Sequence, residues 1–297
     1  MGHASDEVVI AIQPSAAFIP LYIAREKGWI DEALKEYGVK VTWNYFESGP
    51  PMNDSLLAGD SDIGVIGDVP TVTVCMPGNN VEVVAIAARA ADSYAILVPT
   101  NSTLTNAADL KDCRVATVFG STGHNLVQKY LATAGLTIND IDLVNIAAGD
   151  ASSVLSSGQA DAIAIWEPNV TRITSAGLAK IIGEGSDCGL AGTNAIVART
   201  KFAEQNPEII REILHQYKRA ADALPDMDQD TLKAVANALS VDSSLLPEII
   251  SKFEYTVEIG AEDLFSLNDT IKFLNENHII RGEYDISQNA DGSYFGG

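Results

Sequence analysis

The stretch "RVATVFGSTGHNLVQKYLATAGL", residues 114–136, joins a short apolar run to a helical pattern through glycines and hydroxyl side chains. The apolar run predicts a β-strand, and the spacing of the later apolar residues predicts a helix that ends near Leu136. Ser121 and Thr122 at the junction are typical helix N-cap residues. A helix N-terminus also offers unpaired N–H groups and the positive end of the helix dipole to an anion. The stretch therefore predicts a strand–helix unit with a candidate anion seat.

The same alternation of strands and helices runs through the first 200 residues, which predicts an α/β fold with a mostly parallel sheet in its first unit. A turn at Pro14 leads into one helix that ends near Gly38. We expect the strands 81–90 and 94–100 to be the last two strands of the first unit. The second unit starts near Asn101, and its last two expected strands are 179–185 and 194–199. From about residue 200 the pattern changes to long helices, expected at 206–224, 228–239, 244–253 and 262–280.

A second helix N-terminus with similar features follows the strand near residue 65. In "GDVP", residues 67–70, Asp68 is the expected N-cap and Pro70 lies in the first turn. Both predicted helix N-termini follow the carboxyl ends of strands, where α/β proteins bind ligands. Two such N-termini that face each other across a hinge would hold a small anion between two lobes.

The composition describes a globular chain without a membrane-spanning segment. Of 297 residues, 46% are hydrophobic and 20% charged, and no run of about 18 apolar residues occurs. The 40 acidic and 19 basic residues give a net charge of 19 − 40 = −21. Such an acidic surface disfavours nucleic acid and anionic membranes as partners. A small anion remains compatible, because local dipoles dominate inside a cleft.

The motifs that would indicate an enzyme or a metal site are missing. Cys75, Cys113 and Cys188 form no CxxC pair, so we expect no metal and at least one free thiol, with one disulfide left open. Ser121 and His124 lie close together, but no acid is spaced to orient the imidazole. No nucleophile elbow, phosphate-binding loop or HExxH pair occurs. We therefore expect a binding protein without a cofactor.

The beginning of the chain, residues 1–6, has neither a basic nor an apolar segment of a signal peptide. We interpret it as a leader that stands where a signal peptide has been removed.

Four segments together resemble a known family, the periplasmic substrate-binding proteins of ABC importers for aliphatic sulfonates and their taurine- and nitrate-binding relatives. They are "FESGPPMNDSLLAGDSDIGVIGDVP" (46–70), "LKDCRVATVFGSTGHNLVQKYLATAGL" (110–136), "GQADAIAIWEP" (158–168) and "GTNAIVART" (192–200). Their order and spacing carry the resemblance, which covers nearly the whole chain.

The resemblance implies the two-lobed fold of type 2 periplasmic binding proteins, with two crossover strands and a hinge that closes on the ligand. The crossovers would lie near 95–99 and 194–199. Lobe I would comprise residues 1–97 and 197–297, and lobe II residues 98–196. The protein would be a monomer at the periplasmic or extracellular face of the membrane that delivers its ligand to a permease.

The resemblance also implies ligand contacts at both helix N-termini and at neighbouring strand ends. The expected residues are Gln13, Ser15, Gly67, Asp68, Val69, Arg89, Ser121, Thr122, Gly123, His124, Trp166, Glu167 and Asn194. Several have plain structural alternatives. Asp68 and Ser121 can be helix caps only, Trp166 a core residue, and Arg89 either a countercharge or a surface residue.

The expected ligand is a sulfonate, which neutral N–H and O–H donors bind because it is always ionised. Taurine relatives need acids for the ammonium group, and two suitable positions hold Tyr94 and Asn194 here, although Glu167 could still receive a cation. The alternatives are a binder of nitrate, taurine, or a thiamine-pyrimidine or flavin precursor, a ligand-sensing receptor partner, and an enzyme like thiamine-pyrimidine synthase.

Overall fold

The computed structural model describes residues 5–295 of the chain, so most of the expected leader, residues 1–4, lies outside the described residues. Contacts divide the described chain into two compact units. Unit 1 contains residues 5–89, 193–243 and 254–295, and unit 2 contains residues 90–192 and 244–253. Each unit is built around its own β-sheet and is described by itself. The expected hinge and lobe boundaries stay a prediction.

Unit 1 contains a six-stranded sheet in the order β11-β4-β10-β3-β1-β2. Its strands are β1 (Glu7–Ile12), β2 (Lys40–Tyr45), β3 (Ile63–Ile66), β4 (Val81–Arg89), β10 (Thr193–Arg199) and β11 (Glu254–Tyr255). Strand β1 pairs in parallel with β2 and β3, whereas β10 runs antiparallel to β3 and β4, and β11 antiparallel to β4. The expectation of a mostly parallel sheet is therefore wrong for this unit, because β10 returns from unit 2 in the opposite direction.

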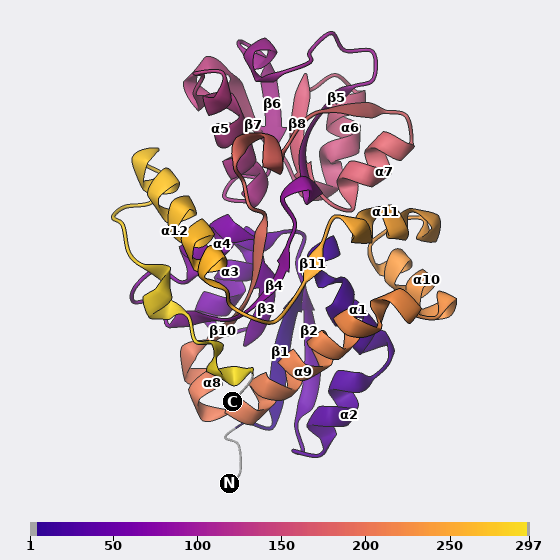
Figure 1. The fold of residues 1–297 in the computed structure, drawn as a ribbon, viewed down its shortest axis with the longest axis vertical. Helices are drawn as coiled ribbons and strands as arrows, with labels where there is room; N and C mark the ends of the chain where they lie inside the picture. Colours follow the sequence, from indigo (N-terminus) through magenta and orange to yellow (C-terminus); the bar gives the residue numbers. More distant parts are fainter. Residues whose placement is uncertain (1–4, 296–297) are drawn as a thin grey trace. The chain divides into compact units, whose positions relative to one another are not determined.

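Two groups of helices cover this sheet, on its right and its left in Figure 1. The first group contains α1 (Ile19–Glu26), α2 (Trp29–Lys35), α9 (Pro207–Ala223) and α10 (Gln229–Ala238). The second contains α3 (Gly49–Ala58), α4 (Asp68–Val74) and α12 (Ala261–Glu276). The short helix α8 (Thr200–Gln205) connects β10 to α9. The helices expected at 206–224, 228–239 and 262–280 are confirmed as α9, α10 and α12. The one expected at 244–253 is only a six-residue helix, α11 (Leu246–Ser251), and it belongs to unit 2.

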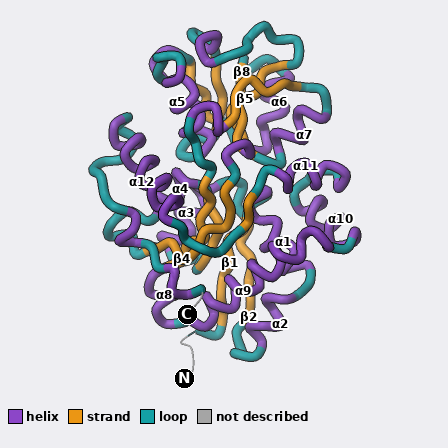
Figure 2. Tube along the Cα trace, viewed as in Figure 1, coloured by secondary structure: helices purple, strands orange, loops and turns teal. Residues whose placement is uncertain are grey.

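Unit 2 contains a five-stranded sheet in the order β7-β6-β8-β5-β9. Its strands are β5 (Tyr94–Pro99), β6 (Arg114–Thr117), β7 (Asp142–Asn145), β8 (Ala162–Trp166) and β9 (Ala179–Glu184). Strand β6 is parallel to β7 and β8, whereas β5 is antiparallel to β8 and β9. The helices are α5 (Thr122–Thr133), α6 (Ala151–Ser156), α7 (Asn169–Ser175) and α11 (Leu246–Ser251). The strands are enclosed by helices in Figure 2, and a buried apolar cluster fills the layer between them.

Three expectations about the elements are wrong. The strand at 94–100, expected in the first unit, is β5 of unit 2, and the strand at 194–199, expected in the second unit, is β10 of unit 1. The single helix ending near Gly38 is two helices, α1 and α2, because Gly28 adopts a left-handed conformation with φ 68° between them. A glycine takes this conformation without the steric cost that other residues meet.

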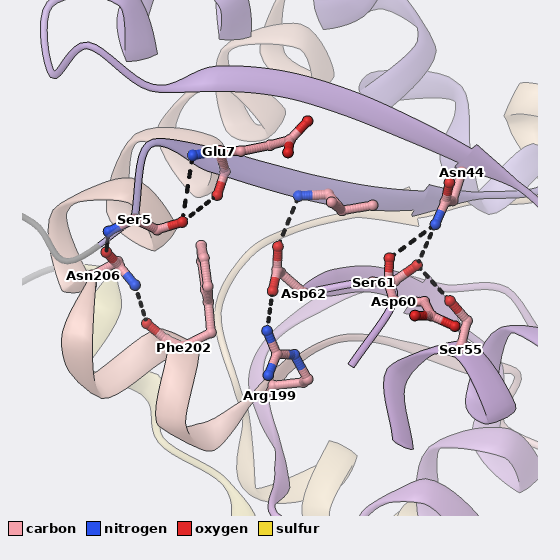
Figure 3. Close-up of polar contacts among 11 residues, drawn as sticks. Ser5, Glu7, Asn44, Ser55, Asp60, Ser61, Asp62, Arg199, Phe202 and Asn206 are labelled. Carbon is pink, nitrogen blue, oxygen red and sulfur yellow. Dashed lines mark hydrogen bonds and ion pairs between the residues drawn. The ribbon is translucent and has the colours of Figure 1, made fainter. Parts of the chain in front are cut away.

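The amino-terminal edge of the unit 1 sheet is fixed by Asp62, which precedes β3 (Figure 3). Its carboxylate accepts the Val9 N–H at 2.8 Å and forms an ion pair with Arg199 of β10. The Arg199 N–H also donates to the Asp62 carbonyl at 2.9 Å. One buried carboxylate thus joins three adjacent strands at the edge opposite to the candidate ligand contacts.

The α/β class with two sheets is confirmed. Within the described residues, no helix is both long and apolar enough to cross a membrane. All three cysteines are free thiols, with Cys75 buried and the other two half-buried. The disulfide that the sequence left open is therefore not formed among them.

Candidate functional site

The helix N-terminus that the sequence singled out lies at the carboxyl edge of the unit 2 sheet. Strand β6 ends at Thr117, and α5 begins at Thr122 with Ser121 as its N-cap. The Ser121 hydroxyl donates to the Val118 carbonyl at 2.7 Å and accepts the His124 N–H at 3.4 Å. The prediction that Ser121 caps this helix is confirmed. Its hydroxyl is engaged in the cap, which leaves it poorly placed to act as a nucleophile.

Thr122 is the residue of this N-terminus whose side chain lacks a partner. It is 2% exposed, and its Oγ1 atom is buried without a hydrogen bond. Because a buried hydroxyl without a partner costs free energy, such an atom indicates a missing ligand or water. In the first helical turn the N–H groups of His124 and Asn125 donate to the Ser121 carbonyl at 3.0 and 3.3 Å, which leaves those of Thr122 and Gly123 for a ligand. Thr122 and these N–H groups together offer hydrogen-bond donors to an anion.

Gly123 brings the start of α5 against the sheet. A Cβ atom at this position would lie 2.8 Å from Thr117 Oγ1 and 3.1 Å from the Ala164 carbonyl oxygen. Thr117 Oγ1 in turn donates to that same carbonyl at 3.0 Å. The glycine therefore lets the helix N-terminus sit directly on β6 and β8.

His124 is a half-buried side chain in surroundings that disfavour the charged form of its imidazole. Burial lowers the pKa of its imidazole. Its Nδ1 accepts the Gly120 N–H at 3.3 Å, its Nε2 lies 3.3 Å from the Gln128 amide, and its ring stacks on Phe119 with centroids 5.2 Å apart. Because its backbone N–H already donates to Ser121, we expect any role of His124 in anion binding to come from hydrogen bonding by its side chain rather than from charge.

Trp166 and Glu167 lie at the carboxyl end of β8, beside the start of α5. Both are buried, and Trp166 pairs with Tyr94 of β5. The Glu167 carboxylate accepts the Thr171 hydroxyl at 2.7 Å, the Thr171 N–H at 3.1 Å and the Lys252 ammonium at 2.6 Å. Sequence reasoning missed Lys252, because 85 residues separate it from its partner.

The second predicted helix N-terminus lies in unit 1, at the end of β3. The assignment of Asp68 as N-cap is wrong by one residue, since Gly67 is the N-cap and Asp68 begins α4. The Asp68 carboxylate still accepts the Val69 N–H at 2.7 Å, and it accepts the Thr270 hydroxyl of α12 at 2.9 Å. It therefore fixes α12 on α4 and is engaged within the unit.

The other candidate residues of unit 1 lie at the same edge of its sheet. Gln13 and Ser15 follow β1 and are buried, and the Gln13 carbonyl accepts the Tyr22 hydroxyl at 3.0 Å. Asn194 is buried in β10, where its neighbour Ala195 pairs with Ile66 of β3.

The structure adds two polar residues at this edge that the sequence did not single out. Ser48, the N-cap of α3, is buried and makes no side-chain capping bond. Asn53 donates to the Pro70 carbonyl at 2.9 Å, while its Oδ1 is buried without a partner. The signal in the sequence was the "ESGP" start of a helix after a strand, which resembles the other two helix N-termini.

Arg89 also lies at this edge, as the last residue of β4, but its charge is neutralised within unit 1. Its Nε and Nη2 donate to the two carboxylate oxygens of Asp263 at 2.7 Å each, and Nη1 donates to Glu254 at 2.7 Å. These acids raise the pKa of the guanidinium further above its usual range. Its role as a countercharge for the ligand stays a prediction, and its ion pairs with these acids favour a structural role.

Among residues 5–295, no group of three or more His, Cys, Asp or Glu side chains is placed to hold a metal ion. The candidate residues thus fall into two groups, one at the carboxyl edge of each sheet. The unit 2 group consists of residues 121–124 with Trp166 and Glu167, and the remaining candidates belong to unit 1.

Comparison with known proteins identifies the family. The NMT1/THI5-like family model matches residues 15–229, which is most of the chain. The chain belongs to the NMT1/THI5-like family. Among the relatives of this family member, a Bacillus subtilis (strain 168) protein named as an aliphatic sulfonates-binding protein is 27% identical over 289 residues, 97% of this chain and 86% of that one. The taurine-binding periplasmic protein of Escherichia coli (strain K12) is 26% identical over 287 residues, 91% and 86% of the two chains.

The fold of this NMT1/THI5-like protein is also that of a solved binding protein. The alkanesulfonate-binding protein SsuA from Xanthomonas axonopodis pv. citri, bound to MOPS, superposes with a TM-score of 0.88 at 23% identity, over 97% of this chain and 98% of that one. This similarity confirms the expected fold.

Proposed function

We propose that the chain is the solute-binding protein of an ABC importer, that it acts outside the cytoplasmic membrane, and that it binds an aliphatic sulfonate or a related small organic oxyanion. The relatives that cover almost the whole chain are binding proteins for such anions, not enzymes. The observation that carries the choice of ligand class is the buried, unpartnered Thr122 hydroxyl at the N-terminus of α5.

The chemistry of a sulfonate fits this helix N-terminus. Its three oxygens share one permanent negative charge, so they accept hydrogen bonds and need no proton transfer. The Thr122 hydroxyl and the first N–H groups of α5 supply neutral donors, and the helix dipole adds a favourable field. Trp166, at the neighbouring strand end, supplies an apolar surface for the alkyl tail.

The candidate residues of unit 1 are proposed as further contacts for the same anion class, through the hydroxyl and amide groups of Ser15, Gln13 and Asn194 and the N-terminus of α4 at Gly67 and Val69. The protein is further proposed to act as a monomer that hands its ligand to a permease.

A thermal-shift experiment on ligand-stripped protein tests the proposal. Ethanesulfonate at a hundredfold excess over its Kd stabilises the folded state by about 2.7 kcal/mol and raises the melting temperature. Thr122→Val removes the hydroxyl and keeps the side-chain shape, so we expect it to lower the affinity at least tenfold. Thr133→Val, at the exposed far end of α5, is the matched control and keeps the shift.

The result that contradicts the proposal is a shift with nitrate or a pyrimidine and none with any sulfonate. Equal affinities of the wild type and Thr122→Val would instead place the anion away from the α5 N-terminus.

A further inference from the structure

The charged side chains among the candidate ligand contacts are all engaged inside their own units. Arg89 is held by Asp263 and Glu254, and Asp68 accepts two hydrogen bonds from Val69 and Thr270. The third is Glu167, the residue that the sequence left open as a receptor for a cation. Its environment in unit 2 decides whether a ligand ammonium can use it.

Both oxygens of the Glu167 carboxylate are engaged by protein groups. Its side chain is 0% exposed, and Oε1 accepts both the Thr171 hydroxyl and the Lys252 ammonium, while Oε2 accepts the Thr171 N–H. Lys252 follows α11, a helix that packs with unit 2 although it lies far along the chain. The Lys252 side chain is itself only 17% exposed. The pair is therefore an internal ion pair that solvent hardly reaches.

This pair lies at the strand edge that bears the proposed anion seat. The first turn of α5 rests on the Ala164 carbonyl through Gly123, and Trp166 and Glu167 follow Ala164 closely at the end of β8. Strands β6 and β8 are parallel, so their carboxyl ends share this edge. A ligand whose sulfonate binds the α5 N-terminus thus has its tail within reach of the β8 end.

We propose that Lys252 determines the specificity of this site by occupying the Glu167 carboxylate from within. An alkanesulfonate with an uncharged tail binds, and one that carries an ammonium group is rejected, because the carboxylate that would pair with it already holds a lysine. A buried carboxylate that loses its ionic partner is left with an uncompensated charge, which a ligand ammonium can then compensate. Lys252 is a positioning residue that acts through Glu167, and this inference rests on the proposed function.

The experiment compares propane-1-sulfonate with taurine, in which an ammonium group replaces the terminal methyl group of the same chain length. Calorimetric titration of the intact wild-type protein is expected to give a taurine affinity at least a hundredfold weaker. Lys252→Met releases the carboxylate, so we expect it to reduce the ratio of the propane-1-sulfonate affinity to the taurine affinity at least tenfold. Lys272→Met, which removes a lysine 65% exposed on α12, is the control and leaves the ratio unchanged.

Two further variants keep the test decisive if Lys252→Met does not fold. Glu167→Gln leaves the lysine unpaired, and its charge repels an ammonium, so we expect the ratio to widen at least tenfold. The double variant Lys252→Met/Glu167→Gln removes both charges. We expect it to be more stable to unfolding than either single variant and not to gain taurine binding.

The outcomes separate this inference from the proposed function. If the wild type binds neither sulfonate, the proposed function fails. If the wild type binds propane-1-sulfonate but Lys252→Met leaves the affinity ratio unchanged, the role of Lys252 is overturned and the proposed function stands. If Lys252→Met does not fold, an unchanged ratio in Glu167→Gln has the same meaning.

Discussion

At the scale of single residues, Gly123 at the N-terminus of α5 has no room for a larger side chain. A Cβ atom there would approach Thr117 Oγ1 to 2.8 Å and the Ala164 carbonyl to 3.1 Å. Gly123→Ala therefore overpacks this contact, at a cost of about 1–3 kcal/mol, of which the helix propensity of alanine returns at most about 1 kcal/mol. We expect urea unfolding to show a net loss of about 1 kcal/mol in the free energy of unfolding, the middle of the resulting range of about 0–2 kcal/mol.

The control for this prediction is Gly149→Ala. Gly149 lies in the same unit, and a Cβ atom added there would meet no heavy atom within 4 Å. We expect a change within about 0.5 kcal/mol, as for most surface substitutions. Equal effects of the two variants would mean that the α5 N-terminus does not need its close approach to β8.

Residue patterns predicted the cap of α5 and, to within one residue, that of α4, but not the partners of the charged groups. Ser121 is the N-cap of α5 because capping depends on neighbours in the sequence, which a single chain displays. Glu167 and Arg89 instead meet Lys252 and Asp263, which lie 85 and 174 residues away. No local pattern encodes such pairs, so the sequence left both residues as open candidates for ligand contact.

At the scale of elements, the existence of helices was predictable and their breaks less so. The long helices α9 and α12 follow their apolar periodicity closely. The boundary between α1 and α2 depends on the left-handed backbone of Gly28, which a helical pattern on both sides conceals. Tertiary packing decides whether such a glycine breaks a helix, and the sequence pattern does not contain that information.

The start of α12 depends on one buried acid, Asp263. Its carboxylate accepts both arms of Arg89 and also the Gly260 N–H at 2.8 Å. Asp263→Asn removes the charge of these hydrogen bonds, each of which contributes about 1.5–3 kcal/mol. We expect a loss of about 2 kcal/mol in the free energy of unfolding, measured by chemical denaturation. Asp222→Asn, in an exposed pair with Lys218, should change it by less than about 0.5 kcal/mol.

A stability loss for Asp263→Asn no larger than that of Asp222→Asn would show that Glu254 and Glu262 are sufficient to compensate the charge of Arg89. The pair would then contribute little to the docking of α12, which would depend on its other polar contacts, such as Thr270 with Asp68 and Ser266 with Thr193.

At the scale of the whole molecule, the sequence could not show which of the two sheets a strand joins. Strands β5 and β10 follow strands of one unit along the chain but pair within the sheet of the other. Apolar runs of this kind are equally compatible with either sheet, because burial on both faces removes the alternating pattern. Composition and periodicity alone therefore placed both strands in the wrong unit.

The net charge of −21 gives a prediction about how the anion reaches the protein. An acidic molecule repels an approaching sulfonate over a Debye length, which falls from about 30 Å at 0.01 M salt to about 8 Å at 0.15 M. We therefore expect the association rate constant, from stopped-flow tryptophan fluorescence, to rise several-fold between about 10 and 150 mM NaCl, because the screening length shortens about fourfold over that range. The dissociation rate should change much less, because short-range hydrogen bonds govern it. An association rate that falls with salt would mean that the positive end of α5, rather than the net charge, dominates the field that the anion meets.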